Sequence, residues 1–117
     1  MLTLDHLLIL LKNQPEKIDF DEVMLLIDSL YDITPTAFHN GTVYNTAEEN
    51  QGSCKLFAFA QEHKFSAKQT LDCFGQHYRN VLKNPDGTDH QNIRQFIAYG
   101  WEGVRFEGET PSLSMRK

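Results

Sequence analysis

Apolar side chains recur at helical spacing along most of the chain and predict its first two helices directly. Thr3 is positioned to cap a first helix that runs to about Lys12 and carries leucines on one face. Asp19 opens a second helix, with Glu22 three residues later as the partner expected in a capping box. The proline at position 35 excludes helix just before it, so the second helix must end by about residue 33.

The second half of the chain shows three further helical patterns. Residues 56–60 are apolar on all sides, which indicates a buried, central helix that begins near Gly52. Ser66 caps the next helix, which we expect to continue to Asn84. Thr88 and Gln91 form the pattern of another capping box, which predicts a last long helix starting there. Its expected inward-facing residues are Ile93, Phe96, Ile97, Trp101 and Val104.

Residues 36–45 carry the strongest β signal. Asn40 and Gly41 are typical of a two-residue hairpin turn, and β-branched or aromatic residues flank them. Residues 104–108 can leave the last helix as a short strand that pairs with this hairpin, and the residues from Glu109 onward are expected to be a frayed tail. The expected fold is mostly α: about five helices around one core in a single domain, residues 1–117, with a small hairpin.

Composition and charge narrow the possible partners. Acidic residues outnumber basic ones by 16 to 11, giving a net charge of −5, so neither nucleic acid nor a membrane is expected as a partner. The longest apolar run, Leu7–Leu11, is far too short to cross a bilayer. Its side chains nevertheless point all round the helix, so a weak homodimer is possible if its neighbours do not cover it. The two cysteines form no disulfide framework, which favours the bacterial cytoplasm.

The sequence contains no recognisable metal or cofactor motif. The five histidines and two cysteines never fall at metal-ligand spacing, and no Gly-rich phosphate loop occurs. We therefore expect neither a metal nor a cofactor. His63 and His77 flank predicted helices and are expected to be solvated.

Polar residues placed on an apolar helix face suggest a site. In a helix that starts at Thr88, His90 lies in the middle of the apolar face, with Asp89 leaning toward it and Arg94 at its edge. Buried polar groups need partners, and the loop that starts the central helix is the obvious source. The predicted cluster comprises Asn50, Ser53, Lys55, Asp89, His90, Asn92 and Arg94. Two interpretations remain open: a satisfied structural network, or a pocket of two helix N-termini that favours a small anionic ligand.

Cys54 suggests an alternative function, that of an enzyme with a nucleophilic cysteine. It falls in the first turn of the central helix beside Lys55, and both circumstances lower the pKa of a thiol. With His90 as a base, Cys54 would supply the nucleophile of a hydrolase or acyl transferase. The competing interpretation is a small buried cysteine with no catalytic role.

Several strings together resemble one family. Residues 34–38, Asn50–Lys55 (Asn-Gln-Gly-Ser-Cys-Lys) and Phe57–Ala60 form the first part of the resemblance. Thr88–Arg94 (Thr-Asp-His-Gln-Asn-Ile-Arg) and Gly100–Trp101 belong to the second. The pattern, from about residue 20 to 108, resembles the HopJ type III effector family.

The resemblance implies a protein related to those that bacteria deliver into plant cells by type III secretion. It implies no established catalytic activity, no cofactor and no catalytic residues. We therefore expect a non-enzymatic domain that binds a partner protein or a small ligand. The leucine-rich start differs from the flexible, Ser-rich leader of type III substrates, which favours a resident cytoplasmic protein over one secreted into a host cell.

Overall fold

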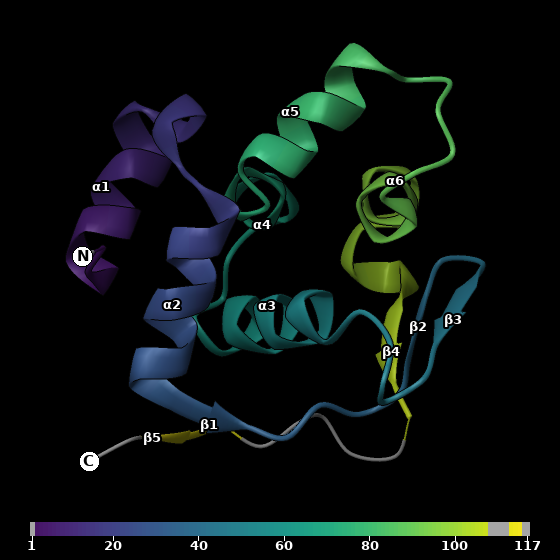
Figure 1. Ribbon diagram of the computed structural model, residues 1–117, viewed down its shortest axis with the longest axis horizontal. Coiled ribbons are helices and arrows are strands. Elements are labelled where there is room, and N and C mark those ends of the chain that lie inside the picture. The colour runs from purple at the N-terminus through teal and green to yellow at the C-terminus, as the bar shows by residue number, and fades with distance from the viewer. Residues whose placement is uncertain (1, 108–112, 116–117) are drawn as a thin grey trace.

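The computed structural model describes residues 2–107 and 113–115, and within them the fold is mostly helical. Figure 1 shows α3 passing through the middle of the molecule, with α1 and α2 on one side and α6 and the hairpin on the other. The helices are α1 (Leu4–Asn13), α2 (Phe20–Leu30), α3 (Gln51–Glu62), α4 (Ala67–Cys73), α5 (Gln76–Lys83) and α6 (Gln91–Tyr99). Short 3-10 helices occupy Pro15–Lys17 and Gly100–Gly103.

Three helix starts follow the sequence prediction. The Thr3 hydroxyl accepts a hydrogen bond from the His6 N–H at 3.1 Å. Asp19 accepts from two N–H groups in the first turn of α2. Ser66 and Gln69 form a complete capping box at α4, each side chain accepting from the other's backbone N–H. Each cap satisfies N–H groups that a helix leaves unpaired, which fixes where the helix begins.

The predicted helix over residues 66–84 is divided in two, and Gly75 is the reason. Gly75 adopts a φ of 58°, a left-handed conformation that ends α4 before α5 begins. A Cβ at this position would lie 2.6 Å from the Phe20 backbone nitrogen and 2.8 Å from the Ile18 carbonyl oxygen. The start of α2 therefore packs directly against the backbone of Gly75, and the described residues hold six helices instead of about five.

A three-stranded antiparallel sheet in the order β3-β2-β4 confirms the hairpin and its third strand. The strands are β2 (Phe38–Asn40), β3 (Val43–Asn45) and β4 (Val104–Phe106). Asn40 pairs with Val43, so the turn residues are Gly41 and Thr42, one position later than predicted. Only Gly41 of these has a positive φ, of 59°, which needs no asparagine before it.

The expectation of a frayed tail is wrong for residues 113–115. These residues form β5 (Leu113–Met115), which pairs antiparallel with β1 (Tyr31–Ile33), directly after α2. The remainder of the expected tail, residues 109–112 and 116–117, lies outside the described residues. Leu113, Ser114 and Met115 do alternate in polarity, but three residues are too short a pattern to predict a strand.

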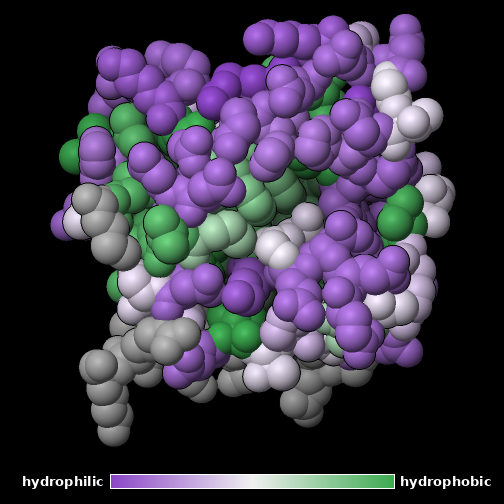
Figure 2. Space-filling view, in the orientation of Figure 1, coloured by the Kyte–Doolittle hydropathy of each residue, from purple (hydrophilic) through white to green (hydrophobic). Residues whose placement is uncertain are grey.

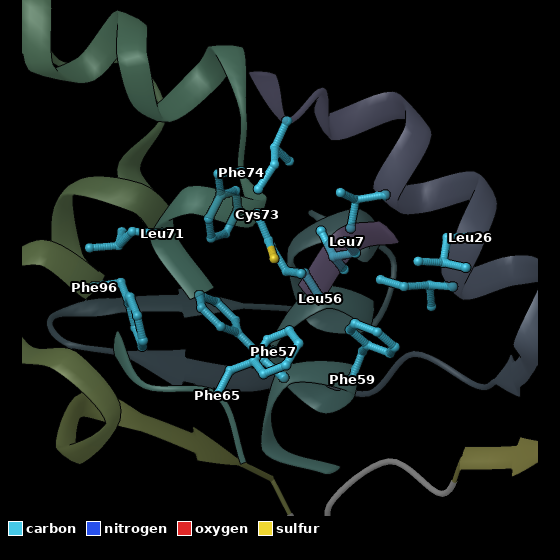
Figure 3. Close-up of a cluster of buried hydrophobic side chains, with 14 of the residues drawn as sticks. Leu7, Leu26, Leu56, Phe57, Phe59, Phe65, Leu71, Cys73, Phe74 and Phe96 are labelled. Carbon is cyan, nitrogen blue, oxygen red and sulfur yellow. The ribbon is translucent and has the colours of Figure 1, made fainter. Parts of the chain in front are cut away.

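The core forms around α3, as its all-round apolar sequence predicts. Leu56, Phe57 and Phe59 are fully buried. Figure 3 shows Phe57 and Phe59 of α3 in the same interior as Leu7 of α1, together with Phe96 of α6. Cys54 and Cys73 are buried free thiols.

Several apolar side chains are exposed, and one of them, Ile97, was predicted to face inward. Leu82 and Ile97 are 57% and 46% exposed, because α5 and α6 present these positions to solvent. On α1, Leu8 and Ile9 are also exposed, so the helix is not fully covered and self-association stays a prediction. No helix within residues 2–107 is long and apolar enough to span a membrane.

Candidate functional site

A cavity of about 380 Å³ opens between the first turns of α3 and α6, with further walls from the starts of α2 and α5. Its volume falls in the range of small-molecule sites. Figure 2 shows apolar side chains in the middle of this face, between the positions of α5 and α6 in Figure 1, bordered by hydrophilic ones. This cavity is the candidate site.

The start of α3 has no side-chain cap although asparagine occupies the capping position. Asn50 adopts a left-handed conformation with φ 51°, and its side chain makes no capping hydrogen bond. Its Nδ2 instead donates to Asn45 Oδ1 at 2.7 Å. The first backbone bond of the helix runs from Cys54 N–H to the Asn50 carbonyl oxygen. The N–H groups before it, including those of Gly52 and Ser53 in the cavity wall, therefore stay open.

The start of α6 also has no side-chain cap. The prediction of a capping box at Thr88 is therefore wrong. The helix begins at Gln91, and His90 precedes it in a left-handed conformation with φ 51° and no capping bond. The Gln91 side chain donates to the Thr88 carbonyl oxygen instead of capping a helix. His90 is thus not on the apolar face of a helix; it lies at the helix start, with its side chain 32% exposed, and lines the cavity.

A buried network of asparagines joins the two helix starts. Asn45 of β3 and Asn92 of α6 exchange two side-chain hydrogen bonds of 3.1 and 3.0 Å. Asn45 Oδ1 also accepts from Asn50, the residue before α3. Asn40 of β2 donates to both the side-chain and backbone oxygens of Asn92. The hairpin therefore fixes the first turns of α3 and α6 relative to each other.

Arg94 and Asp89 lie outside this network, contrary to the predicted cluster. Asp89 is exposed, and its Oδ1 pairs with Arg94 Nη2 at 2.7 Å. Hydrogen bonding to Arg94 lowers the pKa of Asp89. Arg94 also donates to the carbonyl oxygens of Asn84 and Pro85. Arg94 therefore holds the loop between α5 and α6, which sets the position of His90, and it is not a ligand of the cavity.

The rings of two phenylalanines and two histidines form one wall of the cavity. His77, expected to be solvated, lies with its ring centroid 5.0 Å from that of His90 and 5.2 Å from that of Phe20. Phe20 in turn stacks on Phe74 with the ring planes 1° apart. The break at Gly75 turns the start of α5 toward α2 and brings His77 into the site. The glycine that follows Cys73-Phe74 was the sequence signal that could have predicted this break between two helices.

The comparisons with known proteins agree with this architecture. The HopJ type III effector protein family matches residues 4–111, nearly the whole chain. The chain belongs to the HopJ family. A comparison with curated proteins gave no match.

A solved structure resembles this HopJ-family chain closely. The crystal structure of VPA0580, described as a protein of unknown function, is 46% identical and superposes with a TM-score of 0.87. The match covers 95% of this chain and 93% of that one. The HopJ match over residues 4–111 includes both helix starts of the site, and it brings no activity with it.

Two other candidates of this HopJ-family chain lie away from the cavity. Lys55 Nζ forms an ion pair with Asp28 Oδ1 at 3.0 Å, and Lys55 does not line the cavity. Cys54 is also outside it: its Sγ donates to the Thr36 carbonyl oxygen at 3.5 Å. Burial has the larger effect on the pKa of Cys54 and raises it, whereas the hydrogen bond to Thr36 and the charge of Lys55 both lower this pKa by less. The expectation of a lowered thiol pKa is therefore wrong, because the side chain is 1% exposed.

Proposed function

We propose that this HopJ-family protein is a non-enzymatic domain that binds a small anionic ligand of the carboxylate class. The cavity between α3 and α6 is the proposed binding site. The single observation that carries the proposal is that the first turns of both helices, each without a side-chain cap, open into this one cavity.

Open helix starts attract anions for a simple reason. The first N–H groups of a helix have no partner within it, and the helix dipole adds about half a positive charge at that end. Asparagine and serine side chains normally satisfy these groups, and losing such a cap costs typically about 1 kcal/mol. Here Asn50 donates to Asn45 instead, so the N–H groups of α3 remain available to a ligand.

The charge around the cavity favours a single negative charge on the ligand. Among the described residues that line the cavity, none is lysine or arginine. Asp89, whose Oδ2 lies 3.9 Å from His90 Nε2, is neutralised by Arg94. Two helix starts and two imidazoles suit a carboxylate better than a doubly charged phosphate, which proteins typically bind with arginine or lysine.

Binding is favoured over nucleophilic catalysis by the environment of Cys54. A nucleophilic thiol needs an electropositive, accessible setting that lowers its pKa. Cys54 is buried with a raised pKa and bonds to a backbone oxygen. The family description as type III effectors supports delivery into a host cell, where such a domain would capture its ligand.

Calorimetric titration with sodium acetate and sodium cyclohexanecarboxylate, at constant ionic strength, tests the proposal. We expect saturable binding of one carboxylate per chain. Ser53→Asp should abolish it, because the new carboxylate occupies the open N–H groups of α3 while stabilising the helix start. Gln61→Glu, the same charge change at the exposed far end of α3, is the matched control and should leave binding intact. Absence of binding, or equal binding by Ser53→Asp, would contradict the proposal.

A further inference from the structure

Four aromatic rings form a continuous wall along one side of the cavity. Phe74 and Phe20 stack in parallel with centroids 5.8 Å apart. His77 meets Phe20 edge-on at 5.2 Å, and His90 follows at 5.0 Å from His77. All four residues line the cavity, although they come from α2, the segment between α4 and α5, and the starts of α5 and α6.

The ring wall meets the open N–H groups at Gly52. A Cβ on Gly52 would lie 3.3 Å from Phe20 Cζ, so the Phe20 ring sits directly against the first turn of α3. Phe20 is only partly buried, which leaves part of its ring open to the cavity. A ligand bound at the helix start is therefore held next to this aromatic surface.

We propose that the ligand is an aromatic carboxylic acid: a flat ring that contacts the aromatic wall and carries the carboxylate bound by the helix starts. This inference rests on the proposed function and names its ligand class. Aromatic rings interact with one another more favourably than their buried area alone accounts for. A saturated ring of the same size and charge gains the burial but not this additional contact.

Benzoate and cyclohexanecarboxylate make a matched pair of probes, equal in charge and similar in size. We expect the intact chain to bind benzoate about three- to tenfold more tightly in calorimetric titrations at one pH. Phe20→Leu keeps an apolar side chain but removes one ring of the wall. It should weaken the binding of benzoate more than that of cyclohexanecarboxylate, so that the preference for benzoate falls to about twofold or less.

The outcomes separate the two proposals. Equal affinities for both probes in the unmodified chain would overturn the aromatic class and leave the carboxylate site standing. Failure of both probes to bind would overturn the proposed function and this inference together. A preference for benzoate that Phe20→Leu leaves unchanged would also overturn the inference. If Phe20→Leu fails to fold, as its circular dichroism would show, the comparison of probes on the unmodified chain decides alone.

Discussion

Asn45 and Asn92 form a reciprocal amide pair in which each side chain donates to the other. Asn45 Nδ2 lies 3.1 Å from Asn92 Oδ1, and Asn92 Nδ2 lies 3.0 Å from Asn45 Oδ1. The two side chains are almost completely buried and join the hairpin to α6. Because Asn45 also accepts from Asn50, this pair sets the geometry of both helix starts at the cavity.

Replacing Asn45 by alanine should destabilise the protein and weaken the site. The change leaves the buried Asn92 Nδ2 without its acceptor, which costs roughly 1–3 kcal/mol of unfolding free energy in urea denaturation. Asn50→Gly is the control, since Asn50 is exposed, its left-handed backbone suits glycine, and its lost bond can be replaced by water. We expect Asn50→Gly to lose less stability than Asn45→Ala; the opposite order would contradict the role given to the buried pair.

Gly75 and Gly100 offer a matched test of the break between α4 and α5. Both adopt positive φ, of 58° and 60°, so alanine is strained at either position. Only at Gly75 would the new Cβ meet neighbouring backbone atoms, whereas nothing lies within 4 Å at Gly100. Gly75→Ala should therefore cost about 1–3 kcal/mol more than Gly100→Ala in urea denaturation. Equal losses of unfolding free energy in the two variants would show that the close contact between Gly75 and the start of α2 adds nothing to the cost of the substitution.

The two thiols should react with alkylating reagents only after the protein unfolds. Burial raises the pKa of Cys54, and it raises the pKa of Cys73 to about 12. Iodoacetamide modification near neutral pH should be at least about tenfold slower in the native chain than in urea, followed by mass spectrometry. Rapid native alkylation of Cys54, titrating below neutral pH, would revive the nucleophile hypothesis.

His63 should make the stability fall in mildly acidic solution. Its Nε2 lies 2.9 Å from the Tyr31 hydroxyl oxygen, and burial lowers the pKa of His63. The unfolded chain then takes up a proton before the folded chain does, so stability is lost as pH falls from above about 6.5 through the lower folded value. His63→Gln should lose less stability than the unmodified chain between about pH 7.5 and about pH 5 in urea titrations. Identical losses would contradict this coupling.

Local signals predicted the fold well where neighbouring residues in the sequence decide the structure. Ser66 and Gln69 lie three residues apart and cap α4 as the pattern indicates. The all-round apolar run of α3 is fully buried, because no face of it is suited to water. The strand at Val104–Phe106 pairs with the hairpin as expected.

The prediction failed where distant residues decide. The capping pattern at Thr88 is overridden by Arg94, whose bonds to Asn84, Pro85 and Asp89 hold the loop until His90. We expected the starts of α3 and α6 to lie close together, but the sequence did not predict that Asn45 would join them through its hydrogen bonds. Nothing in the hairpin pattern distinguishes a buried asparagine that bonds across 47 residues from one that ends a strand.

The most direct test of the proposed site is a benzoate titration followed residue by residue in ¹H–¹⁵N correlation spectra of the intact chain. We expect the largest saturable shifts at the backbone amides of Gly52, Ser53, Gln91 and Asn92, in the two open helix starts. These shifts should disappear in Ser53→Asp and persist in Gln61→Glu. Shifts that do not saturate, or that centre on residues outside the first turns of α3 and α6, would contradict a carboxylate site in this cavity.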